Sequence, residues 1–160
     1  MAKLNLILTI ITNEIPTTNN KIKSMLQLIL HGIGDYFLQT DNQAVGKKYK
    51  GLYGFKCCLI HCITYSLPFL FIGSWKAVLA IFVSHFIIDR TNIVAYLLAI
   101  KNNVKKKSTI VNYAGESKMV YDISNFGFGL QRPFALTIWL YIICDNLLHI
   151  ICNYLALLFL

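Results

Sequence analysis

Long apolar runs alternate with short polar segments along this chain. Four runs approach the roughly 20 residues that an α-helix needs to cross a hydrocarbon core of about 30 Å. They cover residues 24–40, 56–73, 76–98 and 134–160. The pattern predicts an all-α fold, a multi-spanning membrane helical bundle with about four transmembrane helices.

The third run contains a polar interruption, Asp89-Arg90-Thr91-Asn92. Two readings stay open: the chain leaves the membrane at this point, or it continues as a helix buried against its neighbours. A polar, Gly-containing segment follows at 101–133, and its turn signals "YAG" and "GFG" predict a long loop.

The first residues differ from the rest of the chain. Residues 1–23 hold an apolar stretch too short to span a membrane, so we expect an N-terminal extension that is interfacial or re-entrant. A signal-like role is the alternative, and whether the segment is cleaved stays open. We expect residues 24–160 to form a single helical membrane domain.

Composition agrees with a membrane protein. Of 160 residues, 56% are hydrophobic and only 14% are charged, whereas about 25% are charged in ordinary soluble domains. The net charge of +8 comes from lysines between the apolar runs. We therefore expect them to orient the protein and to contact anionic lipid headgroups of the bilayer, and we give nucleic acid little weight as a partner.

The basic residues also predict the orientation. In a four-span chain, the richer side holds Lys47, Lys48, Lys50, Lys56, Arg90, Lys101, Lys105, Lys106, Lys107, Lys118 and Arg132. The other side holds Lys3, Lys21, Lys23 and Lys76. The richer side should face the cytoplasm, which places loop 101–133 there and both termini outside.

All four histidines fall inside apolar runs, and three have an aspartate four residues away. The pairs are His31 with Asp35, His85 with Asp89, and Asp145 with His149. Residues four apart share one face of a helix. Ionisable groups that face lipid are costly, so these side chains should turn inward and form one cluster between the helices.

Imidazole and carboxylate groups are the ligands that Zn, Mn and Fe use in proteins, and one or two such ions suit a cluster of this size. The candidate metal ligands are His31, Asp35, His61, His85, Asp89, Asp145 and His149. Asp35, Asp89 and Asp145 are also the candidate catalytic carboxylates. For any single His/Asp pair, an interhelical hydrogen bond is the simpler alternative.

Three further kinds of residue receive weaker interpretations. Gln39 continues the polar face of Asp35 and is a candidate for orienting that carboxylate. Arg90 is expected to extend to the membrane interface, with phosphate binding as the alternative. The five cysteines show no zinc-binding spacing and are interpreted as small buried apolar residues.

Taken together, the segments "HGIGDYFLQTD", "CCLIHCITY", "SHFIID" and "CDNLLHII" resemble domain-of-unknown-function family 3307, small multi-spanning membrane proteins of bacteria and their phages. The resemblance covers about residues 25 to 155. It implies a protein of the bacterial inner membrane with an inward-facing His/Asp cluster that includes Gln39, and it brings no established activity. The chain departs from the family at Asn92, where lysine is more usual, and at Asn146, where glutamine is commoner.

Three functions stay open. The favoured one is a metal-dependent hydrolase that acts on a lipid or a lipid-linked phosphoester or amide at the cytoplasmic leaflet. The second is an ion or proton transporter or channel, which four short spans would form as a homo-oligomer. The third is a non-enzymatic phage or bacterial membrane factor in which the metal is structural.

Overall fold

The computed structural model describes residues 18–110 and 117–160, and this part of the chain is mostly helical, as the sequence predicted. In chain order the elements are α2 (Thr18–Gly32), the π-helical turn η1 (Ile33–Phe37), α3 (Asp41–Gly46), α4 (Gly51–Ser66), the 3₁₀ helix η2 (Leu67–Phe71), α5 (Trp75–Arg90), α6 (Ile93–Lys101), β1 (Lys106–Ile110), β2 (Ser117–Tyr121) and α7 (Phe134–Phe159). Most of the expected N-terminal extension, residues 1–17, lies outside the described residues.

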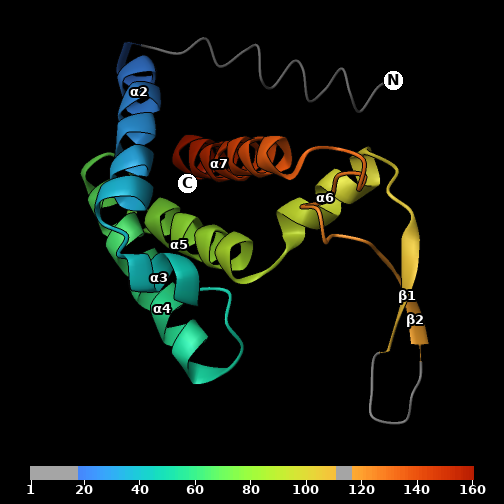
Figure 1. Cartoon of the computed structure of the whole chain (residues 1–160). Helices are drawn as coiled ribbons and strands as arrows, with labels where there is room; N and C mark the ends of the chain where they lie inside the picture. Colours follow the sequence, from blue (N-terminus) through green and yellow to red (C-terminus); the bar gives the residue numbers. More distant parts are fainter. Residues whose placement is uncertain (1–17, 111–116) are drawn as a thin grey trace.

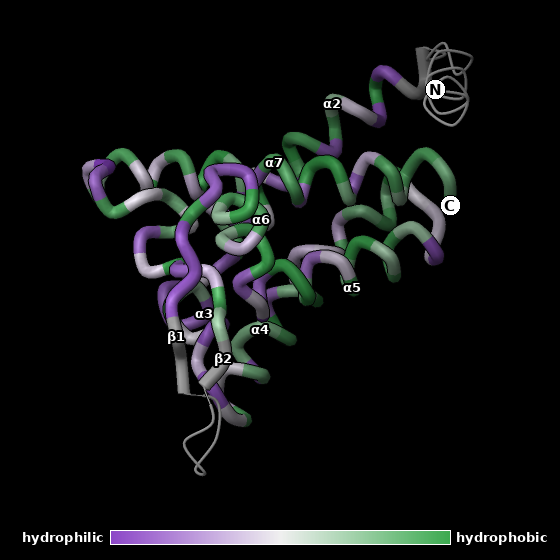
Figure 2. Tube along the Cα trace, turned by 90° about the vertical axis from the view of Figure 1, so that its right-hand side faces the viewer, coloured by the Kyte–Doolittle hydropathy of each residue, from purple (hydrophilic) through white to green (hydrophobic). Residues whose placement is uncertain are grey.

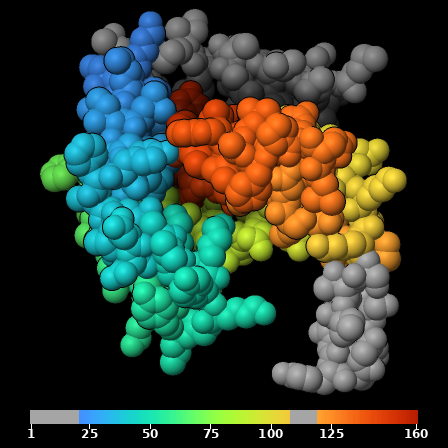
Figure 3. Space-filling view, viewed as in Figure 1, coloured from blue at the N-terminus to red at the C-terminus, as the bar shows by residue number. Residues whose placement is uncertain are grey.

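The helices pack around α5. Its main neighbours are α7 and α4, while α2 contacts α7, and η1 contacts α4. Figure 1 shows α2, α3 and α4 grouped at one end of the α5–α7 pair, with α6 and the two strands at the other end. On the face drawn in Figure 3, α2 and α7 lie together. Contacts therefore link α2, α4, α5 and α7 into one group of helices.

Two candidate membrane spans are present among the described residues. They are Gly51–Phe71, which joins α4 and η2, and Phe134–Phe159. The pair α5 and α6 would make a third if it is one span. The run 24–40 does not qualify, so the structure supports two or three spans by length and composition, fewer than the four predicted.

The surfaces of these helices are strongly apolar. Large side chains such as Phe71 and Trp139 are exposed by 90% and 66%, and Figure 2 shows apolar residues along much of α5 and α7. Exposed apolar area of this extent is unfavourable in water and is typical of contact with lipid.

The interruption in the third run is a sharp bend. Helix α5 ends at Arg90, Thr91 adopts an extended backbone conformation, and α6 continues from Ile93 at 70° to α5. The Ile87 carbonyl accepts both the backbone N–H of Thr91 at 3.1 Å and the Thr91 hydroxyl at 2.7 Å, so Thr91 closes the last turn of α5. The chain therefore continues as a helix after the bend, with Val94, Ala95, Leu98 and Ala99 buried, and departure from the membrane at this point stays a prediction.

The segment 101–133 is not the structureless loop that was predicted. Strands β1 and β2 pair antiparallel within it, with Lys106 opposite Tyr121. At the base of this hairpin, Lys107 donates to Asp122 at 2.9 Å, and this hydrogen bond lowers the pKa of Asp122 to about 2. The turn signal at "YAG" lies outside the described residues, and no pattern in the sequence indicated the pairing of β1 with β2.

Candidate metal site

The seven His and Asp side chains singled out in the sequence lie together where η1, α2, α4, α5 and α7 meet. Each has an imidazole nitrogen or carboxylate oxygen within 3.6 Å of another member of the set. The members are His31, Asp35, His61, His85, Asp89, Asp145 and His149. We refer to them below as the His/Asp cluster.

At its centre, two imidazoles and two carboxylates converge. The Nε2 atoms of His61 and His85 are 3.0 Å apart. Asp35 Oδ1 lies 3.2 Å from the His61 nitrogen and 3.5 Å from the His85 nitrogen. Asp89 Oδ2 lies 3.2 Å from the His61 nitrogen and 3.3 Å from the His85 nitrogen. The four atoms thus form two triangles that share the edge between the two nitrogens.

These spacings fit a metal ion. Ligand atoms about 2.0–2.2 Å from a tetrahedral ion are about 3.3–3.5 Å from one another, and the distances within each triangle, 3.0–3.5 Å, are close to this spacing. Without an ion, the paired nitrogens of His61 and His85 can share at most one proton between them. Both imidazoles are at least 99% buried, and their Nδ1 atoms find no hydrogen-bond partner among the described residues.

The second oxygen of Asp89 belongs to another group of possible ligands. Asp89 Oδ1 lies 3.6 Å from Nε2 of His149, and that nitrogen lies 3.6 Å from Asp145 Oδ2. Within the described residues, the groups that could hold a metal ion include Asp35 with His61 and His85, and Asp89 with Asp145 and His149.

A further such group contains a cysteine that the sequence interpretation set aside. Cys62 lies with His85 and Asp89 as a third possible ligand set. Its thiol is buried one helical turn from Cys58, with 3.8 Å between the two sulfurs. No zinc-binding spacing identifies Cys62 in the sequence, because its neighbours in the group come from α5.

Lys47 is a functional candidate that sequence reasoning missed. Its ammonium group donates to both carboxylate oxygens of Asp89 at 2.9 Å. Burial by itself lowers the pKa of Lys47, but the adjacent Asp89 carboxylate more than compensates, and the pKa is raised. Lys47 follows α3 in a polar segment, where neither periodicity nor a motif distinguishes it from the other lysines.

Arg90 makes a contact that neither prediction named. Its guanidinium donates to the backbone carbonyl of Lys47 at 3.2 Å. Arg90 therefore holds the segment that carries Lys47 against the end of α5, and its extension to the membrane interface and its binding of phosphate stay predictions.

His31 is better placed to support the site than to bind a metal. Its Nε2 donates to Asn146 Oδ1 at 2.9 Å, and its Nδ1 lies 2.8 Å from the hydroxyl of Tyr65. The same hydroxyl accepts a hydrogen bond from Asn153 at 2.7 Å. Since both ring nitrogens are engaged, the ligand prediction for His31 does not agree with the geometry, and the side chain instead lies beside Asp35 Oδ2 at 3.3 Å.

Gln39 does not orient Asp35 as expected. Its Nε2 is buried and has no hydrogen-bond partner within residues 18–110 and 117–160. The reason lies in the backbone, because the α-helix gives way to the π-helical turn η1 at Ile33 and ends before Gln39. The four-residue spacing that relates Asp35 to Gln39 in an α-helix is lost there.

The π-helical turn also brings Asp35 close to α4. A side-chain carbon at Gly34 would lie 2.9 Å from Cε2 of Tyr65 and still closer to Cδ2. Only glycine leaves room for this contact, which places η1 against the face of α4 that carries His61 and Tyr65. π-Helical turns of this kind are frequent at functional sites.

The centre of the cluster is buried and three of the charged groups around it are partly exposed. His61, His85, Asp89 and His149 are at least 98% buried, whereas Asp35, Lys47 and Asp145 keep 13%, 16% and 24% of their side-chain surface. The partly exposed groups carry the charges that a polar molecule entering from outside would meet first.

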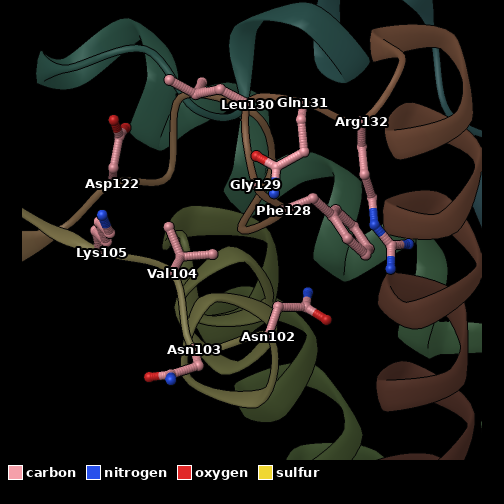
Figure 4. Close-up of a pocket in the computed structure, with 10 residues that line it drawn as sticks. All are labelled: Asn102, Asn103, Val104, Lys105, Asp122, Phe128, Gly129, Leu130, Gln131 and Arg132. Atoms are coloured by element: carbon pink, nitrogen blue, oxygen red, sulfur yellow. The ribbon is translucent and has the colours of Figure 1, made fainter.

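A separate cavity of about 520 Å³ lies at the base of the hairpin and includes no member of the His/Asp cluster. Figure 4 shows Lys105 and Asp122 on one side of it and Arg132 on the other. The guanidinium of Arg132 lies 5.3 Å from the ring centre of Phe128, in a cation–π contact. This cavity is polar and basic, but it contains none of the converging ligand groups.

Comparison with known proteins gives one match. A family described as "Protein of unknown function (DUF3307)" matches residues 24–159. No curated protein and no solved structure matches the chain.

Proposed function

Since the chain belongs to the DUF3307 family, whose description names no activity, we propose its function from its own site. We propose that it is an integral membrane protein that binds a divalent metal ion through His61, His85, Asp35 and Asp89. With this ion it hydrolyses a lipid or a lipid-linked phosphoester or amide. The inner membrane of a bacterium, with the site open to the cytoplasmic leaflet, is the proposed location.

One observation carries the proposal. Four oxygen and nitrogen atoms from η1, α4 and α5 lie at five mutual distances of 3.0–3.5 Å. Two carboxylates in an apolar, buried setting need compensating positive charge. A Zn, Mn or Fe ion supplies it and uses this ligand set, whereas an interhelical hydrogen bond needs only two of the four groups.

A bound ion of this kind polarises the scissile group and lowers the pKa of bound water. The protein's own groups would do the rest. Asp145, which keeps 24% of its side-chain surface, would accept a proton from water, and Lys47 would attract an anionic substrate. The nearly complete burial of His61, His85, Asp89 and His149 favours a fixed site over a conduction path, which requires openings on two sides.

The first test is metal content. The parent protein, purified in detergent without chelators, is compared by elemental mass spectrometry with the double variant His61→Gln/His85→Gln and with the control Asp122→Asn, which lies outside the cluster. We expect near-stoichiometric metal in the parent and the control, and at least a tenfold loss in the double variant. Equal metal in all three samples, or none in the parent, would contradict the site.

The second test is chemistry. Phosphate release from phosphatidic acid vesicles is measured for the metal-loaded parent and for Asp145→Asn, with ion uptake by proteoliposomes measured in parallel. Metal-dependent release that falls at least a hundredfold in Asp145→Asn is the expected result. Ion uptake without phosphate release would replace hydrolysis with transport.

A further inference from the structure

Asp89 presents its two carboxylate oxygens to two different groups of ligand atoms. Oδ2 lies 3.2 and 3.3 Å from the Nε2 atoms of His61 and His85, and Oδ1 lies 3.6 Å from Nε2 of His149. We propose that Asp89 bridges two divalent metal ions. The first ion is the one in the proposed function, on which this inference rests, and the second is held by Asp89, Asp145 and His149.

The second group has its own ligand geometry. His149 Nε2 lies 3.6 Å from Asp89 Oδ1 and from Asp145 Oδ2, near the spacing expected between ligands of one ion. His149 is 98% buried, and its Nδ1 has no hydrogen-bond partner among the described residues. The rings of His85 and His149 are 4.1 Å apart between centroids, so the two ligand groups are immediate neighbours.

Lys47 is compatible with the bridge. A carboxylate has about four lone-pair sites on its two oxygens, so each oxygen of Asp89 can accept one hydrogen bond from the Lys47 ammonium and bind one ion with the other lone pair. The two hydrogen bonds from Lys47 fix the orientation of the Asp89 carboxylate, as groups next to metal ligands commonly do.

Charge indicates the substrate class. Asp35, Asp89 and Asp145 carry three negative charges, and Lys47 carries one positive charge, so one divalent ion with neutral histidines leaves the cluster neutral. A second ion raises the net charge of the cluster to +2. In a buried site this excess charge requires a bound anion. A phosphoester substrate carries the negative charge itself, whereas an amide substrate does not. Paired metal ions are the usual arrangement for displacement at phosphorus.

The experiment uses the full-length protein, stripped of metal with a chelator and titrated with Mn²⁺. Bound Mn²⁺ is counted, and low-temperature electron paramagnetic resonance detects magnetic coupling between ions. We expect two ions per chain and a coupled signal in the parent. We expect one ion and an uncoupled signal in Asp145→Asn/His149→Gln, and Asp122→Asn, outside the His/Asp cluster, should match the parent. Elution as a single symmetric peak in size-exclusion chromatography verifies folding of each variant.

The outcomes separate the two proposals. The parent could bind one uncoupled ion that is lost in His61→Gln/His85→Gln but kept in Asp145→Asn/His149→Gln. This result would overturn the bridge by Asp89 and leave the single-metal function intact. No bound ion would overturn both. If Asp145→Asn/His149→Gln does not fold, Asp145→Asn alone decides, because it should lower the affinity for the second ion at least tenfold and leave the first unchanged.

Discussion

At the level of single residues, Asp89 has three kinds of neighbour. Its carboxylate contacts the imidazoles of His61 and His85 on one side, that of His149 on the other, and the ammonium of Lys47. A carboxylate that is 98% buried keeps its charge only when such partners are present. The ion pair between Lys47 and Asp89 therefore contributes to the stability of the protein as well as to its site.

Removing Lys47 tests that contribution. We expect Lys47→Met to lower the free energy of unfolding by about 3 kcal/mol, because the buried Asp89 charge would lose its counter-ion. Lys48→Met is the control, since the Lys48 ammonium donates to the backbone carbonyl of Thr91 and not to the carboxylate. It should cost less than about 1 kcal/mol. Unfolding of the metal-free protein in mixed detergent micelles measures both.

A double-variant cycle completes this test. Asp89→Asn/Lys47→Met should cost clearly less than the sum of the two single variants, because neither charge is then left without its partner. Additive costs would show that the two side chains do not interact energetically.

The sequence was informative about residues that obey helical periodicity. The four-residue spacing within His85/Asp89 and Asp145/His149 placed their side chains on one helical face, and these side chains do contact each other. Lys47 was not identifiable, because its position beside Asp89 depends on how a polar segment folds back over the end of α5. Metal binding and catalysis by these residues remain predictions.

At the level of elements, the meeting of η1 with α4 depends on the small size of Gly34. We expect Gly34→Ala to lower the free energy of unfolding by about 1–3 kcal/mol, because its methyl group would overlap the ring of Tyr65. Gly32→Ala, two residues away, is the control: its added carbon meets nothing within 4 Å. That variant should be neutral or slightly stabilising.

Thermal unfolding of the two glycine variants, side by side with the parent, makes the comparison. Metal content gives a second measurement, since a displaced η1 would move Asp35 away from His61 and weaken binding. Equal melting temperatures for Gly34→Ala and Gly32→Ala would mean that the approach of η1 to α4 is not tight.

The elements that the sequence did not predict share one physical feature. The bend after α5, the π-helical turn η1 and the pairing of β1 with β2 all depend on backbone hydrogen bonds or on contacts between distant segments. Apolar periodicity reports which face of a helix is buried. It does not report where a bend separates two helices or where an α-helix changes to a π-helical turn. The start of α7 at Phe134 was predicted because an apolar run begins there, after Pro133.

At the level of the whole molecule, α7 is a candidate span that separates the segment 102–133 from the C-terminus. The distribution of Lys and Arg predicts that this segment is cytoplasmic. Alkaline phosphatase fused after Arg132 should therefore be inactive, and the same enzyme fused after Leu160 should be active, since it folds only outside the cytoplasm. Equal activity of the two fusions would show that α7 does not cross the membrane.

The ion pair between Lys47 and Asp89 also bears on the order in which the protein is made. Synthesis proceeds from the N-terminus, so Lys47 leaves the ribosome before Asp89, and α7 with His149 leaves last. When α5 is made, the residue that pairs with its Asp89 carboxylate is therefore already present, whereas His149 is not. In the proposed membrane setting, this pairing would lower the cost of inserting α5, and only the arrival of α7 would complete the site.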